Sequence, residues 1–119
     1  MEDMYVTIVG FRHYYDKTPF EIGNLIRYIK EPDNLHDREA IKCTLPCIGT
    51  VGYLANSVNT VAGGTMSAGR VYDKVEKRFY ARVMFTTNSK IICKVERGDR
   101  KELGRELRKQ LDDDWFDDE

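Results

Sequence analysis

Residues 71–96 read VYDKVEKRFYARVMFTTNSKIICKVE, and this stretch decides the fold class. Two long strand-like segments, 71–85 and 91–96, are rich in β-branched and aromatic residues. Between them, Thr87-Asn88-Ser89 is typical of a hairpin turn, which joins two antiparallel strands. The stretch therefore predicts a long β-hairpin within an antiparallel sheet.

Shorter strand-like segments precede this hairpin. The clearest covers residues 40–45, where Ile41, Cys43 and Leu45 alternate with polar side chains in the period of two that marks a half-buried strand. Strands do not alternate with helices, so a parallel sheet is not expected. Five or six antiparallel strands in about 95 residues predict a mainly β, α+β fold, curled into a small barrel or sandwich that removes exposed edges. The remaining strand-like segments are residues 5–9, 25–29 and 48–54.

Two short helical segments are expected before the hairpin. The first runs from Asn56 or Ser57 through Ala62 and is ended by Gly63-Gly64. The second is a shorter turn over residues 65–68. Both would connect strands without adding a second core.

The C-terminal part of the chain differs from the barrel in its pattern. Residues 99–111 predict a helix, because leucines four residues apart form an apolar stripe among charges. Residues 112–119 then hold six acids, two aromatic residues and no base. Three interpretations of this acidic tail are open. It is a disordered, solvent-exposed end, or it mimics a phosphate strand with stacked bases. Alternatively, its two aromatic residues extend the apolar stripe of the helix onto a partner subunit. We expect a barrel domain over 1–97 and a helix with an acidic tail over 98–119.

The net charge of −1 conceals an uneven distribution. Residues 1–111 hold 19 bases and 14 acids, and residues 70–111 alone hold 13 bases against six acids. A basic second half suits nucleic acid or another polyanion. A solvated surface of lysine and arginine explains the same numbers without a partner.

Several function classes find no support in the sequence. The length of 119 residues fits one domain, no apolar run approaches the ~18 residues of a membrane span, and the acidic N-terminus does not resemble a secretory signal. Three cysteines predict no disulfide framework, and Cys43 and Cys93 fit apolar strand positions better than a metal site or a nucleophile. We therefore expect a non-catalytic, cytoplasmic protein without metal, cofactor or membrane contact.

The stretch that carries chemistry is residues 10–54. Its rings provide stacking platforms for bases, and its arginine provides a forked donor for phosphate. A carboxylate among such residues is suited to accept a hydrogen bond from a sugar hydroxyl, such as a 3′-OH. Alternatively, these are ordinary residues at a barrel rim, and the carboxylate closes an Asx turn. The residues concerned are Arg12, His13, Tyr14, His36, Asp37 and Tyr53.

The order Gly-Phe-Arg-x-Tyr, Glu-Pro-Asp-Asn-x-x-Asp, Ala-Ile-Lys and Val-Gly-Tyr-Leu resembles the HIRAN domain. The resemblance covers about residues 4–96. HIRAN domains stand at the N-terminus of SNF2-type fork-remodelling ATPases and also occur alone in small bacterial proteins. The resemblance implies a small OB-like β-barrel of five to six strands with two helices, and binding of single-stranded DNA by its 3′ end.

The resemblance also implies roles for single residues. Arg12 looks like the arginine that contacts the phosphate of the terminal nucleotide, and Asp37 looks like the carboxylate that receives the 3′-hydroxyl. His13 and His36 stand where DNA-binding members have tyrosines, and Tyr53 stands where they have a histidine. These exchanges keep a ring surface and alter its hydroxyl hydrogen bonds.

Three further positions complete the expected nucleic-acid contacts. Tyr14 belongs to the first motif, and Asn56 falls near a position that is lysine in the family. Phe79 matches a base-stacking phenylalanine in a loose alignment. Residues after 97 have no counterpart in the domain pattern.

Two classes of function compete. The first is a non-catalytic module that binds single-stranded DNA or other nucleic-acid ends, in DNA repair, with a helicase or a nuclease as protein partner. The second is a protein-interaction or structural barrel that has kept the scaffold and lost the DNA site. An enzyme that no motif reveals is the remaining alternative.

Overall fold

Six strands form a closed antiparallel barrel. The structure, a computed structural model, describes residues 3–57 and 59–116, and for 112–116 it describes the backbone alone. The strand order around the barrel is β1-β4-β3-β2-β5-β6. The strands are β1 (Tyr5–Val9), β2 (Leu25–Lys30), β3 (Ile41–Leu45), β4 (Gly49–Leu54), β5 (Arg78–Thr86) and β6 (Ile91–Glu96).

Strand β1 closes the barrel because it pairs on both of its sides. Val6 lies opposite Cys93 of β6, and Ile8 lies opposite Leu54 of β4. Closure leaves no long open edge on which another chain could add a strand. The expected mainly β barrel and the long hairpin of β5 and β6 are both confirmed.

The barrel interior is filled by every second residue of each strand. Ile41 and Cys43 point inward, as the alternating pattern predicts. Inside, the rings of Tyr28 and Phe79 stack at 5.0 Å between centroids, with 14° between their planes. Cys43 and Cys93 are free, buried thiols, which confirms the interpretation of both as core residues. The buried side chains form one continuous core.

The expected helix over residues 56–62 is wrong. The described residues of this segment form turns, and the first α-helix is α1 (Ala68–Tyr72), capped by the Ser67 hydroxyl, which accepts from the Arg70 amide. The reason is tertiary. Thr7 is fully buried, and its hydroxyl accepts from the Ala62 amide at 3.1 Å and lies 2.7 Å from the Thr65 hydroxyl. The segment therefore folds across β1 instead of coiling into a helix.

The expected start of the long strand at residue 71 is also wrong. Val71 is a buried residue of α1, and β5 begins only at Arg78. Val71 and Tyr72 are β-formers by propensity, but packing against the core decides their state. The shorter turn expected at residues 65–68 shares only its last residue, Ala68, with α1.

The C-terminal helix α2 spans Arg100–Phe116, longer than the expected 99–111. It packs on the barrel through Leu103 and Leu107, which are 9% and 1% exposed. The Gln110 side-chain amide pairs with both backbone groups of Leu25: its oxygen accepts from the amide at 2.7 Å, and its nitrogen donates to the carbonyl at 3.1 Å. The hypotheses about the acidic tail fall on side chains outside the described residues.

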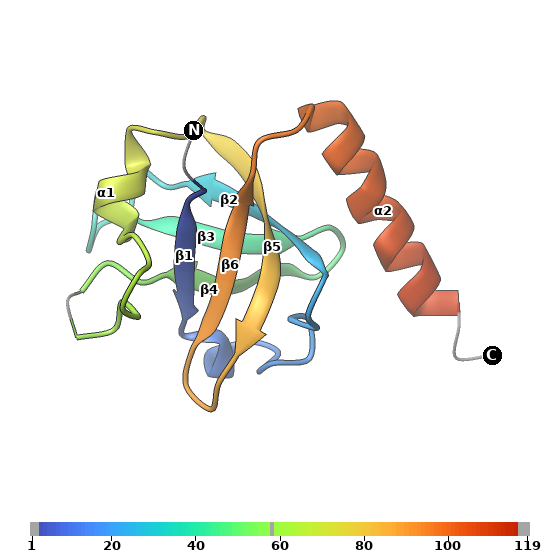
Figure 1. The fold of residues 1–119 in the computed structure, drawn as a ribbon, viewed down its shortest axis with the longest axis horizontal. Helices are drawn as coiled ribbons and strands as arrows, with labels where there is room; N and C mark the ends of the chain where they lie inside the picture. Colours follow the sequence, from blue (N-terminus) through green and yellow to red (C-terminus); the bar gives the residue numbers. More distant parts are fainter. Residues whose placement is uncertain (1–2, 58, 117–119) are drawn as a thin grey trace.

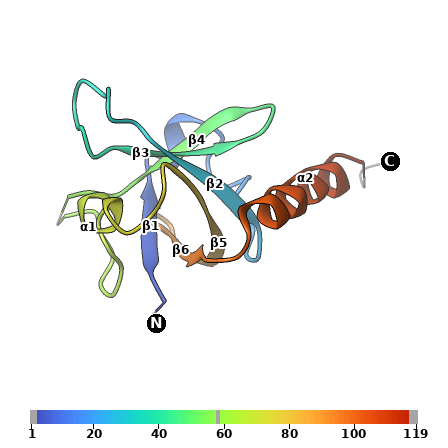
Figure 2. The ribbon, with the colours of Figure 1, turned by 90° about the horizontal axis from the view of Figure 1, so that it is seen from above.

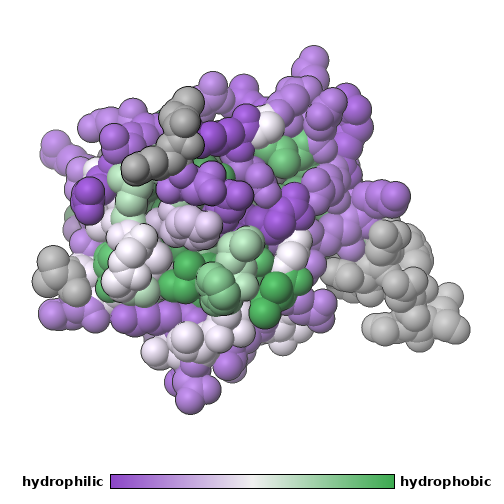
Figure 3. Space-filling model, viewed as in Figure 1, coloured by the Kyte–Doolittle hydropathy of each residue, from purple (hydrophilic) through white to green (hydrophobic). Residues whose placement is uncertain are grey.

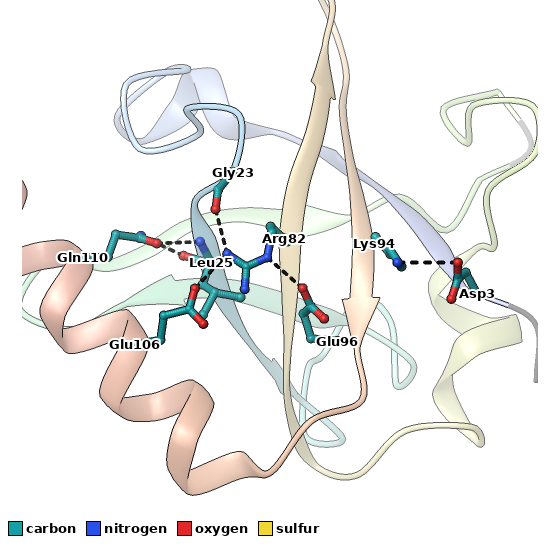
Figure 4. Close-up of polar contacts among 8 residues, drawn as sticks. All are labelled: Asp3, Gly23, Leu25, Arg82, Lys94, Glu96, Glu106 and Gln110. Atoms are coloured by element: carbon teal, nitrogen blue, oxygen red, sulfur yellow. Dashed lines mark hydrogen bonds and ion pairs between the residues drawn. The ribbon is translucent and has the colours of Figure 1, made fainter.

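An ion-pair network ties α2 to β5 and β6, as Figure 4 shows. Arg82 pairs with Glu96 at 2.7 Å and with Glu106 of α2 at 2.8 Å, and it donates to the Gly23 carbonyl at 2.9 Å. The helix α2 is thus attached at two places, to the start of β2 through Gln110 and to the middle of β5 through Glu106.

The two α-helices lie on opposite sides of the barrel, α1 beside β1 and α2 beside β2 and β5 (Figures 1 and 2). The short 3-10 helix η1 (Phe11–His13) follows β1 at the end of the barrel where the β5–β6 hairpin turns (Figure 1). In the part of the chain that the structure describes, no helix combines the length and the apolar character needed to cross a membrane.

Candidate nucleic-acid interface

The segment that follows β1 turns sharply and presents Arg12. Gly10 has a φ of 72°, a left-handed conformation that glycine adopts without strain, and the 3-10 helix η1 starts there. Phe11 is buried against Phe20, with 6.1 Å between ring centroids. Because Phe11 anchors the turn, Arg12 and His13 point to solvent, and Arg12 donates to the Asn88 carbonyl of the β5–β6 turn.

Two exposed tyrosines extend this turn. Tyr14 and Tyr15 are 44% and 46% exposed, and the Tyr15 hydroxyl donates to the Ile48 carbonyl at 3.3 Å. A small pocket of about 210 Å³ opens beside them, lined by residues 10–13 and Ser89. Rings and an arginine thus share one surface at this end of the barrel.

The loop between β2 and β3 holds Asp37 in a fixed position. The Asn34 side-chain oxygen accepts from the backbone amides of His36 at 2.9 Å and of Asp37 at 3.1 Å. Asp37 Oδ1 accepts from the Glu39 amide at 2.9 Å, which is the Asx turn considered for this carboxylate in the sequence. His36 is exposed and Asp37 is half-buried. The loop geometry therefore does not depend on a ligand.

Asp37 is the acceptor at the end of a directional hydrogen-bond chain. The Gly69 amide donates to the Asn56 side-chain oxygen at 2.8 Å, which leaves the Asn56 nitrogen to donate to Asp37 Oδ2 at 2.9 Å. The Glu39 amide donates to Asp37 Oδ1 at 2.9 Å. Each carboxylate oxygen accepts one of these hydrogen bonds and keeps a free lone pair.

A glycine lets the start of α1 approach this chain. A Cβ at Gly69 would lie 2.7 Å from the Glu39 carboxylate oxygen and 3.2 Å from the Asn56 side-chain oxygen. The exposed Glu39 side chain could turn aside, but a side chain at position 69 would still be tight against Asn56. Gly69 thus couples α1 to the position of the Asp37 carboxylate.

Tyr53 is linked to the same loop through Glu31. The Tyr53 hydroxyl donates to Glu31 at 2.9 Å, the Asn34 amide nitrogen donates to the same oxygen at 3.3 Å, and Lys42 pairs with the other oxygen at 3.7 Å. Burial, together with the hydrogen bond to Glu31, raises the pKa of Tyr53 to about 12. Tyr53 is therefore a hydroxyl donor throughout the neutral and mildly alkaline range.

The structure brings most of the predicted residues to one face. Strand β4 contacts η1, Tyr14 lies close enough to act electrostatically on Tyr53, and Asn34 connects the Tyr53–Glu31 pair to Asp37. Figure 2 shows η1 and the β2–β3 loop on the side of the barrel formed by β3 and β4. We call this face the loop surface, made up of Arg12, His13, Tyr14, His36, Asp37 and Tyr53.

Two predicted residues occupy other positions. Phe79 is 7% exposed and stacked on Tyr28 inside the barrel, so it offers no free ring face at the loop surface. Asn56 is half-buried with both ends of its amide occupied, by Gly69 and by Asp37. Its position is that of a residue that orients Asp37.

Phe85 is an exposed ring that sequence reasoning missed. It is 60% exposed near the end of β5, close to the β5–β6 turn to which Arg12 donates. A period of two from Phe79 through Val83 would put Phe85 inside the barrel. A bulge between Val83 and Phe85 shifts the register, so Phe85 lies opposite half-buried Ile92 and faces outward. Figure 3 shows an apolar patch over the ends of β5 and β6.

Glu31 and Asn34 are also missing from the sequence-based site. Both lie in the motif that ends at Asp37, and the structure makes them the link between Tyr53 and Asp37. No signal in the sequence distinguishes Glu31 from an ordinary turn residue, because its partners Tyr53 and Lys42 come from other strands. The partners of Asn34 lie within its own loop.

The described residues also bear on metal and thiol chemistry. Within residues 3–57 and 59–111, no three His, Cys, Asp or Glu side chains are grouped so as to hold a metal ion. Burial raises the pKa of the Cys43 thiol well above its usual range and that of Cys93 to about 12. Neither thiol is a nucleophile near neutral pH.

Comparisons with known proteins identify the family and the fold. The model of the HIRAN domain family matches residues 1–97. The fold is similar to the crystal structure of the HIRAN domain of human HLTF, with a TM-score of 0.51 and 20% identity over 90% of this chain and 87% of that chain. It is also similar to a protein from Lactobacillus plantarum, with a TM-score of 0.54 and 18% identity over 77% of this chain and 88% of that chain. Comparison with curated proteins gives no match.

The closed six-stranded antiparallel barrel and its helices define an OB-like barrel protein. The chain belongs to the HIRAN domain family. HIRAN domains are binding modules, and membership supports a nucleic-acid-binding module here. The family match ends at residue 97, three residues before α2 begins.

Replacing Tyr53 with phenylalanine tests the Tyr53–Glu31 link. We expect a loss of about 1 kcal/mol in the free energy of unfolding near pH 8, because a hydrogen bond to a charged group is removed at a half-exposed site. The folded pKa of about 12 lies above the usual pKa of about 10, so the contribution of Tyr53 declines as the pH rises between these values. The difference in free energy of unfolding between the parent and Tyr53→Phe should therefore become smaller as the pH rises from 10 toward 12.

Urea titrations at pH 8, 10 and 11 measure this gap. Tyr15→Phe is the matched control, since its hydroxyl makes a 3.3 Å bond at an exposed site, and we expect a change within about 0.5 kcal/mol. A gap for Tyr53→Phe that stays constant across the pH series would contradict the proton-linked bond to Glu31.

Proposed function

We propose that the loop surface binds single-stranded DNA by its 3′ end. The observation that carries this proposal is the Asp37 carboxylate, which is half-buried, accepts from Asn56 and Glu39, and has a free lone pair on each oxygen. Such a group accepts one more hydrogen bond without rearrangement. A terminal hydroxyl supplies that donor, whereas a phosphate repels the carboxylate.

Arg12 supports the same proposal from the other side of the surface. Its guanidinium has five N–H donors, and the described contact to the Asn88 carbonyl leaves others for a phosphate. The arginine and the carboxylate thus offer complementary groups for the phosphate and the hydroxyl of one terminal nucleotide.

The exposed rings support stacking of the bases. Tyr14 of the loop surface is 44% exposed, and Phe85, near the β5–β6 turn, is 60% exposed. Stacking of one base on an aromatic ring contributes about 1–3 kcal/mol and does not depend on sequence. We propose that these rings, with His13 and His36, hold bases near the end of the strand, and that Asn56 acts on the end only by orienting Asp37.

A module of this kind reads an end and performs no chemistry on it. It would serve a helicase or a nuclease in DNA repair inside the cell, by bringing that protein to a free 3′ terminus. The competing proposal is a barrel that binds proteins only. The two differ in their response to salt, because contacts to phosphates release counterions.

Replacing Arg12 with alanine tests the proposal. We expect the affinity for a 3′-hydroxyl oligonucleotide to fall about tenfold, because a charge-assisted contact is lost, and the slope of log affinity against log salt to lessen by about 0.7. Fluorescence anisotropy over a salt series measures both quantities. Arg12→Lys keeps the charge without the fork and should retain part of the affinity.

Arg70→Ala is the matched control, since it removes the same charge from an exposed residue of α1 that is not part of the loop surface. It should change the affinity less than about threefold, as expected for a solvent-screened charge. A native protein that binds no oligonucleotide at low salt would overturn the proposal in favour of the protein-binding barrel. An Arg12→Ala variant no weaker than the control would remove Arg12 from the site.

A further inference from the structure

The outward side of α2 carries a row of cations. Lys101, Arg105, Arg108 and Lys109 are all exposed. Their spacing of three to four residues places them on one side of the helix, opposite Leu107 and the other side chains that pack on the barrel. Figure 3 shows a hydrophilic surface over this side of the molecule. We call these four residues the α2 basic stripe.

Neighbouring acids do not neutralise the stripe. Glu106 is paired with Arg82 at 2.8 Å, and Glu76 is paired with Arg100 at 3.0 Å. In the part of the chain that the structure describes, no carboxylate lies within ion-pair distance of the four stripe residues. Among the side chains that the structure describes, the four stripe cations are thus exposed and without an ion-pair partner.

One row along α2 holds cations in succession between residues 101 and 109. A solvated helix gains most from an acid placed four residues before a base. Here Lys101, Arg105 and Lys109 follow one another at intervals of four, so like charges repel along the row. The docked leucines, the Gln110 amide and the Arg82–Glu106 pair hold the helix in spite of this. A like-charged row on a fixed helix is complementary to a polyanion.

A continuous stretch of chain connects the stripe to the loop surface. The residues after Tyr14 run to Gly23, whose carbonyl accepts from Arg82, the partner of Glu106 in α2. The molecule measures 43 Å along its longest axis. A stacked strand that advances about 3.4 Å per nucleotide would cross this length with on the order of ten nucleotides.

We propose that the α2 basic stripe binds the phosphate backbone of a nucleic-acid strand several nucleotides away from the 3′ end that the loop surface holds. This inference rests on the proposed function. It assigns to α2, which lies beyond the family match, a role in holding the body of the strand, while the barrel reads its end. The stripe adds affinity that depends on length and salt, and it adds no selectivity for the end.

The test neutralises three stripe residues together, as Lys101→Gln, Arg105→Gln and Arg108→Gln in one chain. The matched control neutralises three exposed cations that lie outside α2, as Arg70→Gln, Lys74→Gln and Lys77→Gln. The probes are oligothymidines of about 6 and about 24 nucleotides with a free 3′-hydroxyl, labelled at the 5′ end, long enough in the second case to span the molecule. Thermal melts followed by circular dichroism confirm that each variant is folded.

We expect the stripe variant to bind the long probe about tenfold more weakly at low salt, with a salt slope lessened by about 2, and to bind the short probe like the parent. The control variant should change either affinity by less than about threefold. Equal losses in both variants would show a general effect of net charge and overturn the proposal. The proposal would also be overturned if the stripe variant bound the long probe as tightly as the parent does. The same holds if its affinity for the short probe fell as much as its affinity for the long one.

The end of the probe separates this proposal from the proposed function. If the parent does not distinguish a 3′-hydroxyl from a 3′-phosphate on the short probe, while the stripe variant still loses affinity for the long one, end recognition fails and the stripe stands. If the parent distinguishes the ends and the stripe variant keeps full affinity, the stripe fails and end recognition stands. Binding of neither probe by the parent overturns both.

Discussion

Truncating Leu107 to alanine is expected to lower the free energy of unfolding by about 2–5 kcal/mol. Leu107 is 1% exposed between α2 and the barrel, so its removal leaves a cavity at the contact that docks the helix. The helix is also held by Leu103, by the Gln110 amide on Leu25 and by the Arg82–Glu106 pair. Urea unfolding followed by circular dichroism measures the loss.

The matched control for this prediction is Leu35→Ala. Leu35 is 97% exposed at the tip of the β2–β3 loop, and the same three carbon atoms are removed without a cavity. We expect the control to change stability by less than about 0.5 kcal/mol. A loss below about 1 kcal/mol for Leu107→Ala would mean that α2 is not part of the cooperative fold, and it would remove the rigid support on which the basic stripe depends.

Replacing Asp37 with asparagine is expected to weaken binding of a 3′-hydroxyl oligonucleotide about tenfold or more, and to abolish most of the preference for a hydroxyl over a phosphate. Two donors already point at the carboxylate, the backbone amide of Glu39 and the side-chain amide of Asn56. The Gly69 amide fixes the direction of the Asn56 side chain. An asparagine at this position would direct its own N–H groups at one of these donors. The acceptor for the terminal hydroxyl would thus lose both its charge and its orientation.

Asp33→Asn is the control, because it removes the same charge from an exposed residue of the same loop. Anisotropy titrations of both variants with hydroxyl-ended and phosphate-ended oligonucleotides give the four affinities needed. If the two variants lose affinity equally, the effect of Asp37→Asn is one of loop charge, and its assigned role as hydroxyl acceptor is wrong.

Much of the barrel follows from local pattern. The alternation at Ile41 and Cys43 and the turn after Lys30 report burial and chain reversal directly, because a strand exposes every second side chain and a proline with Asx residues stops it. The stripe of Leu103 and Leu107 likewise predicts the face of α2 that packs. Such features need no knowledge of distant partners.

The errors have a common physical cause, which is contact between segments far apart in the sequence. The segment over 56–62 has helix signals, yet the buried Thr7 hydroxyl accepts the Ala62 amide and turns it across β1. Phe85 departs from the alternating pattern for a similar reason, since a bulge between Val83 and Phe85 turns its ring outward. Phe79 precedes the bulge and lies inside the barrel, as the alternation through Val83 requires. A register shift of one residue cannot be recognised from the hydrophobicity pattern of the sequence.

In the candidate site, too, the residues that can be predicted from the sequence differ from those that depend on distant contacts. Residue types at Arg12 and Asp37 are informative because an arginine fork and a carboxylate have specific chemistry. The parts that orient them are not visible locally: Asn56 reaches Asp37 across 19 positions of sequence, and Tyr53 reaches Glu31 across 22. Only the closed barrel brings these pairs together.

The most direct test of end recognition uses the native protein and three single-stranded DNAs of equal length and sequence. One ends in a 3′-hydroxyl, one in a 3′-phosphate, and one is a closed circle without an end. Because a 3′-phosphate places negative charge against Asp37, we predict that the hydroxyl end binds about tenfold or more tightly than the phosphate end, with the circle weaker than the hydroxyl end. Equal affinity for all three would contradict recognition of the 3′ end at the loop surface.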